Sequence, residues 1–259
     1  MVNTSGWRMT EETGLLSVDG EEIAWRRLPG KAPTVVWLGG LRSDMSGTKA
    51  QALADWAQAT GQGCLRFDYQ GHGGSSGEFA DGTIGRWKAD ALAAIDQLTE
   101  GPLVLAGSSL GGWIACLVAR ERPERVAGMV LIAPAADFTE ALMRPSLPDE
   151  ALAAIERDGV WLEPNAYDPD DPLPITRRLL DEGREHLILS GDEIEIDCPV
   201  RILQGGEDLD VPWDHALGLA VAIRSRYLTF TLVKDGDHRL SRPQDLDRLI
   251  AAIEELALG

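Results

Sequence analysis

The chain has 259 residues, of which 44 % are hydrophobic and 25 % charged, as in one large folded domain. Its formal net charge of −18 argues against binding to nucleic acid or to an anionic membrane surface. The cysteines, Cys64, Cys116 and Cys198, show neither a disulfide framework nor a zinc spacing, and the first twelve residues show no signal-peptide pattern. These features favour a cytoplasmic protein.

Apolar periodicity predicts strands and helices in alternation along most of the chain. Residues 15–18 and 23–28 should form a hairpin around Asp19-Gly20. Further strands are predicted at 34–38, 64–67, 103–106, 126–132, 200–203 and 228–233, and helices at 49–59, 84–98, 113–120, 215–223 and 245–256. Such alternation predicts an α/β fold with a parallel sheet covered by helices on both faces.

The stretch 101–119 carries no charge and resembles a membrane span by hydropathy. Pro102 and the central Gly/Ser cluster instead favour a buried strand, a sharp turn and a helix, so we expect no membrane span. Residues 137–196 contain six prolines and break the alternation, with helices predicted only near 150–157 and 175–183. We therefore expect a core made of residues 1–136 and 197–259, with residues 137–196 inserted as a cap.

The pentapeptide Gly107-Ser108-Ser109-Leu110-Gly111 lies between the predicted strand and helix. It reads Gly-x-Ser-x-Gly, which in this context forms a nucleophile elbow. The flanking glycines place Ser109, rather than Ser108, at the nucleophile position. We expect strained dihedral angles in this turn, and side chains at either glycine would collide with the neighbouring strand or helix.

A serine nucleophile needs a base, and four histidines are available. His72 precedes the serine, whereas folds with this elbow place the base last. His186 lies in the predicted cap and His215 in a predicted helix. His238 remains, on the tight loop after the predicted last strand, and it is our candidate base.

The acid that orients the base should follow the strand 200–203, where Glu207, Asp208 and Asp210 compete. The pattern Gly-x-x-Asp-x-x-Val-Pro selects Asp208, with Asp210 as the alternative and Glu207 less favoured. Asp210 also suits a carboxylate at a helix start.

The oxyanion hole requires two backbone donors. One should be the amide of Leu110, after the nucleophile, and the other the amide of Leu41, with Gly40 as the alternative. The glycine-rich loop 71–75 lacks the ending of a phosphate-binding loop, and we interpret it as structural.

In this order, the motifs resemble those of the α/β-hydrolase superfamily. Within it, the chain is similar to the group of mitochondrial palmitoyl-protein thioesterases and acyl-glucuronide esterases. The segments that carry this similarity are Ser46-Gly47-Thr48-Lys49-Ala50, Arg66-Phe67-Asp68-Tyr69, Gly85-Arg86-Trp87-Lys88, the elbow through Trp113, Gly159-Val160-Trp161, Val211-Pro212-Trp213 and Asp237-His238-Arg239. The resemblance implies an eight-stranded sheet with a helical cap, and it matches Ser109, Asp208 and His238 to the family's triad. No mitochondrial presequence is recognisable, so we expect a cytosolic relative.

These observations predict a serine hydrolase of esters or thioesters that acts on a small-molecule or acyl-group substrate without a metal or organic cofactor. An aminopeptidase, with cap acids binding the substrate amine, is one alternative. A small-molecule-binding protein that has lost turnover is the other. Trp161 and Tyr167 are candidate substrate-binding residues, although core packing explains them equally well.

Overall fold

The computed structural model describes residues 9–164, 172–191 and 193–259. Its centre is an eight-stranded sheet in the order β1-β2-β4-β3-β5-β6-β9-β10. The strands of this sheet are β1 (Glu12–Val18), β2 (Glu21–Leu28), β3 (Lys31–Leu38), β4 (Gln62–Phe67), β5 (Leu103–Ser108), β6 (Val126–Ile132), β9 (Val200–Gly205) and β10 (Leu228–Val233). The pairs β1–β2 and β2–β4 are antiparallel, and every later pair is parallel. The predicted mostly parallel, eight-stranded sheet is confirmed.

The first two strands form the predicted hairpin. Asp19 and Gly20 connect them with φ values of 48° and 89°. Two consecutive positive φ angles are the signature of a type I′ turn, whose twist matches that of the paired strands. The dipeptide Asp-Gly therefore fixes the register, which places Val18 opposite Glu21.

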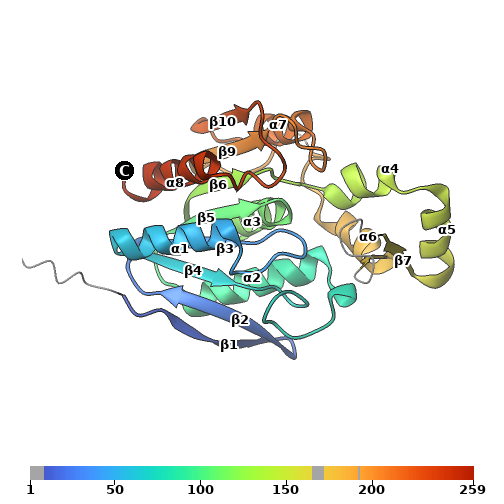
Figure 1. Cartoon of the computed structure of the whole chain (residues 1–259), viewed down its shortest axis with the longest axis horizontal. Helices are drawn as coiled ribbons and strands as arrows, with labels where there is room; N and C mark the ends of the chain where they lie inside the picture. Colours follow the sequence, from blue (N-terminus) through green and yellow to red (C-terminus); the bar gives the residue numbers. More distant parts are fainter. Residues whose placement is uncertain (1–8, 165–171, 192) are drawn as a thin grey trace, which may run out of the picture.

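Helices cover both faces of the sheet (Figure 1). They are α1 (Thr48–Thr60) and α8 (Pro243–Ala257) on one face, and α2 (Ile84–Leu98), α3 (Leu110–Glu121) and α7 (Trp213–Ala222) on the other. Alternate residues of a strand point to opposite faces. In β3, Val35 and Trp37 accordingly pack with α1 and α8, whereas Val36 and Leu38 belong to the apolar cluster on the other face. A sheet buried on both sides is the reason why its central strands are apolar throughout.

The segment between β6 and β9 projects beyond the carboxyl ends of the strands (Figure 1). It contains a π-helical turn (Thr139–Met143), α4 (Arg144–Ser146), α5 (Asp149–Asp158), β7 (Val160–Glu163), β8 (Leu173–Thr176) and α6 (Arg177–Gly183). Strands β7 and β8 form a separate antiparallel pair. A small apolar cluster that includes Ala151, Ile155 and Leu180 lies within this segment. Leu179 and Ile188, in contrast, pack into the main core, so the segment is anchored on the sheet domain.

The structure corrects one expectation about the insertion and sharpens another about residues 101–119. Residues 175 and 176, where the pattern predicts the start of a helix, end strand β8, and α6 begins only at Arg177. Thr176 explains this difference, because its backbone is extended and its side chain caps α6 by accepting a hydrogen bond from the Leu179 amide. The uncharged stretch 101–119 divides into β5 and α3 around the elbow. Among the described residues, we find no helix with the length and apolarity needed to span a membrane.

Candidate active site

The elbow forms where β5 ends at Ser108 and α3 begins at Leu110. Ser109 lies between them with φ 53° and ψ −118°, a strained conformation for a residue with a side chain. The two glycines are required by space. A Cβ atom at Gly107 would lie 2.3 Å from the Gly111 carbonyl oxygen, and one at Gly111 would lie 2.0 Å from the Leu38 carbonyl oxygen. The strain that we expected in the turn is thus found at Ser109, the candidate nucleophile.

A continuous chain of hydrogen bonds joins the candidate nucleophile, base and acid. The distance from Ser109 Oγ to His238 Nε2 is 3.1 Å, and that from His238 Nδ1 to Asp208 Oδ2 is 2.9 Å. The three residues follow the carboxyl ends of β5, β10 and β9, which are parallel and therefore end at the same edge of the sheet. This geometry allows a serine hydroxyl to pass its proton to the imidazole.

Asp208 determines which nitrogen of His238 carries the proton. Burial would raise the pKa of Asp208, but hydrogen bonds from His238 and from the Val211 amide hold that pKa below its usual value. An ionised carboxylate only accepts hydrogen bonds, so Nδ1 must donate. His238 Nε2 is then free to accept the proton of Ser109.

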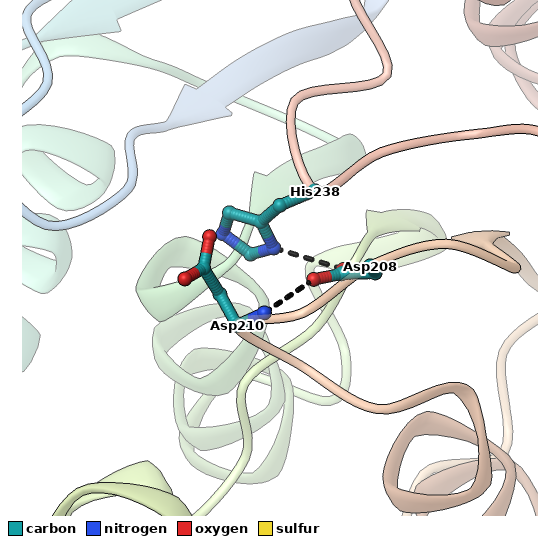
Figure 2. Close-up of side chains that lie close together, drawn as sticks. All are labelled: Asp208, Asp210 and His238. Carbon is teal, nitrogen blue, oxygen red and sulfur yellow. Dashed lines mark hydrogen bonds and ion pairs between the residues drawn. The ribbon is translucent and has the colours of Figure 1, made fainter.

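The other two carboxylates of this loop are placed differently. Figure 2 shows Asp208 hydrogen-bonded both to His238 and to the backbone amide of Asp210. The Asp210 carboxylate also points toward the imidazole, but no hydrogen bond joins the two groups. Glu207 is exposed, and its amide donates to the Gly236 carbonyl. This bond joins the loop after β9, which carries Asp208 (the acid loop), to the loop after β10, which carries His238 (the base loop).

Asp208, Asp210 and His238 each present one possible metal-binding atom, and these atoms lie within 4.8 Å of one another. The donor set nevertheless suits proton transfer better than metal binding. Asp208 accepts four hydrogen bonds, and both ring nitrogens of His238 are engaged by Asp208 and Ser109. A metal ion would have to displace the hydrogen bonds that orient the base.

The remaining histidines have partners of their own. His72 is buried, and its Nδ1 lies 3.0 Å from the Gln70 carbonyl oxygen. His186 pairs with Glu182 at 2.8 Å, and His215 Nε2 lies 2.8 Å from the Ala136 carbonyl oxygen. None of these three histidines lines the cavity at Ser109. Elimination by chain order and by predicted element thus selects the histidine that contacts the serine.

The two candidate oxyanion loops meet at the nucleophile. Leu110 is the first residue of α3, and a first-turn amide has no acceptor within its own helix. A Cβ atom added to Gly40 would lie 3.4 Å from the Ser109 Cβ atom, so the chain passes close to the nucleophile there. Leu41 and Gly40 both line the cavity with Leu110.

Ser109 and His238 lie in the wall of a cavity of about 880 Å³. The wall contains both apolar and polar residues. The apolar part consists of Trp37, Leu41, Leu110, Ala135, Phe138, Leu142, Met143, Leu209, Val211 and Pro212. The polar part includes Ser43, Asp44, Thr48, Lys49, Ser146, Glu163, Asp210, Arg239 and Ser241. An apolar wall with a few convergent polar groups suits a small ligand that has an apolar portion.

Of the two predicted substrate-binding aromatic residues, the structure describes only Trp161. Trp161 lies in β7 and packs, half-buried, against the apolar cluster of the insertion. It does not line the cavity formed by the described residues, whereas Glu163 of the same strand does. Packing explains Trp161, because a large ring gains most from burial among apolar neighbours. Tyr167 lies outside the described residues.

The glycine-rich loop after β4 is hydrogen-bonded to the segment that precedes α1. Asp68 accepts hydrogen bonds from the amides of Met45, at 2.6 Å, and Gly74, at 2.8 Å. Its carboxylate therefore ties this loop to the segment between β3 and α1. None of the residues 68–75 lines the cavity, which agrees with the structural interpretation of this loop.

Gln204 is a site residue that the sequence analysis missed. It is fully buried at the end of β9, and its side-chain nitrogen lies 3.0 Å from Asp208 Oδ2 and 3.0 Å from the Val211 carbonyl oxygen. Its side chain therefore helps to orient the Asp208 carboxylate. A signal was available, since an amide side chain that directly follows the apolar residues Ile202 and Leu203 needs a hydrogen-bonding partner when it is buried.

Comparisons with known proteins give the family. The family model described as serine aminopeptidase, S33 matches residues 32–168. The mitochondrial palmitoyl-protein thioesterase ABHD10 of mouse is 38 % identical over 234 residues, which span 90 % of this chain and 78 % of the relative. Its human counterpart is 36 % identical over 238 residues, spanning 92 % of this chain and 77 % of the relative.

Two solved structures agree. A putative hydrolase from Agrobacterium vitis superimposes with a TM-score of 0.90 at 44 % identity, covering 95 % of this chain and 99 % of the other. Mouse alpha/beta hydrolase domain-containing protein 10 superimposes with a TM-score of 0.86 at 36 % identity, covering 95 % and 98 %. The expectation of a cytoplasmic location is wrong, because the mammalian palmitoyl-protein thioesterases that match most of this chain are named as mitochondrial. The fold, the serine-histidine-aspartate arrangement and these relatives together show that the chain belongs to the α/β-hydrolase family and is a hydrolase.

Proposed function

We propose that this chain hydrolyses thioesters and carboxylic esters through an acyl-enzyme formed on Ser109. The observation that carries the proposal is the hydrogen-bond chain from Ser109 Oγ through His238 to Asp208, which lies in the wall of a partly apolar cavity. The names of the mammalian relatives, palmitoyl-protein thioesterases, support a fatty acyl thioester as substrate.

In the proposed reaction, Ser109 Oγ attacks the acyl carbonyl carbon while His238 Nε2 takes the hydroxyl proton. The carbonyl oxygen becomes an oxyanion, which the Leu110 and Leu41 amides would stabilise, with the Gly40 amide as the alternative to Leu41. The carbon–sulfur or carbon–oxygen bond then breaks, and His238 gives its proton to the departing thiol or alcohol. Asp208 stabilises the imidazolium throughout.

Water completes the cycle. His238 takes a proton from a water molecule, which attacks the acyl-enzyme, and a second tetrahedral intermediate forms in the same oxyanion hole. Its collapse returns the proton to Ser109 and releases the carboxylic acid. The apolar residues Phe138, Leu142 and Met143 give an acyl chain a surface to bury.

Labelling with a fluorophosphonate probe tests the nucleophile. We expect the wild-type chain to be labelled and to hydrolyse p-nitrophenyl esters, and Ser109→Ala to lose both properties. Ser108→Ala is the matched control, since Ser108 is the adjacent buried hydroxyl and makes no hydrogen bond to His238. It should keep most of the activity. An inactive Ser108→Ala beside an active Ser109→Ala would reverse the assignment.

A substrate panel tests the reaction class. Acetyl, octanoyl and palmitoyl groups are compared as p-nitrophenyl esters and as coenzyme A thioesters, beside amino-acid p-nitroanilides. We expect turnover of thioesters and esters and none of anilides. A preference for anilides would favour the aminopeptidase that the family description names. Absence of both labelling and turnover would favour the ligand-binding alternative.

A further inference from the structure

Lys49 connects the beginning of α1 to the loop that carries the base. It is the second residue of α1, it is half-buried, and it lines the cavity that contains Ser109 and His238. Its ammonium donates a hydrogen bond to the main-chain carbonyl of Arg239, the residue directly after His238. Ser241 Oγ lies 3.4 Å from the same nitrogen.

Other hydrogen bonds also hold the loop that carries His238. From the β9 side, the Glu207 amide donates to the Gly236 carbonyl at 2.9 Å, upstream of the histidine. Within the loop, the Asp237 side chain accepts from the Leu240 amide at 3.0 Å, and Ser241 Oγ donates to the Arg239 carbonyl at 3.0 Å. Lys49 binds the loop on the carboxyl-terminal side of His238, through the Arg239 carbonyl. It does so from α1, which follows the segment with Gly40 and Leu41. It therefore connects α1 with the loop that carries His238.

Lys49 is a poor candidate for a stabilising residue. Burial lowers its pKa to about 8, against opposing effects of Asp237 and Asp245, and Arg239 lowers it further. Among the ion pairs of the described residues, none includes Lys49. A lysine whose pKa falls on folding makes the folded state bind fewer protons than the unfolded state between about pH 8 and its ordinary value of 10.5. Stability should then rise with pH through this window, so the charge costs stability at neutral pH.

We propose that Lys49 is a positioning residue for the hydrolase reaction, and that its bond to the Arg239 carbonyl holds His238 within reach of Ser109. The inference rests on the proposed function. A residue that costs folding stability and contacts the backbone beside the base fits a role in function better than a role in folding. Displacement of the base by a fraction of an ångström would slow proton transfer without removing any group that binds substrate.

The decisive comparison is Lys49→Met against Lys49→Arg, with Lys88→Met as the matched control. Lys88 pairs with Glu121 on the surface, at 2.6 Å, and does not line the cavity. We expect Lys49→Met to lower kcat about 10- to 100-fold, as small misplacements of catalytic groups do, with KM changed less than twofold. Its melting temperature should be unchanged or higher. Lys49→Arg, which keeps a charged donor, should recover most of kcat, and Lys88→Met should keep the wild-type kcat.

The pH profile supplies a readout that a structural role would not move. Loss of the ammonium proton weakens a charge-assisted hydrogen bond, so wild-type kcat/KM should decline several-fold above about pH 8. Lys49→Arg should keep its activity to higher pH, because guanidinium stays protonated. The same alkaline decline in both proteins would overturn this part of the proposal.

The outcomes separate this inference from the proposed function. An inactive wild-type chain, or an active Ser109→Ala, contradicts the proposed function. An active wild-type chain with an equally active Lys49→Met contradicts the role of Lys49 alone. If the loss appears in KM, Lys49 binds substrate instead. If kcat and melting temperature fall together and Lys49→Arg restores neither, Lys49 is structural.

Discussion

Asp208 accepts a hydrogen bond from each of four donors: the amides of Asp210 and Val211 on one oxygen, and His238 and Gln204 on the other. With every position around the carboxylate occupied, its orientation is fixed before substrate arrives. The oriented carboxylate in turn fixes the tautomer of His238. The hydrogen bonds to Asp208 thus leave His238 Nε2 as the nitrogen that can accept a proton from Ser109.

This arrangement predicts unequal effects for the two neighbouring aspartates. Asp208→Asn should lower kcat by about 10³- to 10⁴-fold, because an amide in this position favours the wrong tautomer of the base. Asp210→Asn should change kcat by less than about tenfold, since its carboxylate makes no hydrogen bond to His238. Steady-state kinetics with a p-nitrophenyl ester at pH 7 measure both. A larger loss in Asp210→Asn would make Asp210 the acid.

Residue identities in the triad were predictable because each depends on a local pattern. Gly-x-Ser-x-Gly selects Ser109, the loop after the last predicted strand selects His238, and the spacing before Val211-Pro212 selects Asp208. Gln204 and Lys49 follow no such pattern. Their partners, Asp208 and the Arg239 carbonyl, are defined by how separate loops approach one another in space. A sequence motif does not encode that approach.

At the level of elements, the close approach of strand, turn and helix constrains the elbow most tightly. Gly111 leaves no room for a Cβ atom beside the Leu38 and Gly39 carbonyls, so α3 can start directly against β3. Gly218, in the middle of α7, has no atom within 4 Å of the position its Cβ would take. The same residue type is therefore required in one helix and costly in the other.

Alanine substitutions at these two glycines should have opposite signs. Gly111→Ala should lower the free energy of unfolding by about 3 kcal/mol or more, because backbone atoms on both sides must move. Gly218→Ala should raise it by about 0.5–1 kcal/mol, since alanine loses less backbone entropy inside a helix. Urea unfolding monitored by circular dichroism measures both. Equal stabilities for Gly111→Ala and wild type would mean that the elbow can open without cost.

Prediction of elements succeeded for the long, regular ones. The bounds of α2, β6 and β10 agree with the apolar pattern to the residue, because each has a strong periodicity and a clear start or end. It failed for β7 and β8, which have four residues each. Four residues are too few to establish a period of two, and their pairing depends on chain segments that the pattern does not connect.

At the level of the whole molecule, the sheet separates two apolar layers, and each layer contains a buried cysteine. Cys64, in β4, belongs to the layer under α1 and α8, and Cys116, in α3, belongs to the opposite layer. Both are buried, and burial raises the pKa of each thiol to about 12. Cys198 is half-buried, and burial raises the pKa of its thiol to about 11.

Alkylation should therefore report global unfolding. With iodoacetamide at pH 8, we expect Cys64 and Cys116 of the native protein to stay unmodified, because little thiolate forms and the reagent cannot reach them. Cys198 should react first, and all three should react once urea unfolds the chain. Mass spectrometry of digested samples follows each site. Modification of Cys64 at a rate independent of urea would show that its layer opens locally.

The layers of the fold were predictable from alternation and the eight-stranded sheet from the family resemblance, but the detail of the insertion was not. The division into a core of residues 1–136 and 197–259 and a cap of 137–196 stays a prediction. Leu179 packs with the main core while Leu180 packs within the insertion, so neighbouring residues of one helix serve both parts. Alternation along the chain cannot resolve such shared packing.

The parallel pairing of β6 with β9, across the whole insertion, has a consequence for synthesis. A ribosome makes the chain from its amino terminus, so Ser109 emerges and can fold with β3, β5 and β6 long before β9 and β10 exist. Asp208 and His238 are made only after the insertion, in the loops that follow β9 and β10. The nascent chain would therefore carry Ser109 without the two residues that we propose activate it, and the serine should become reactive only once both loops have been added.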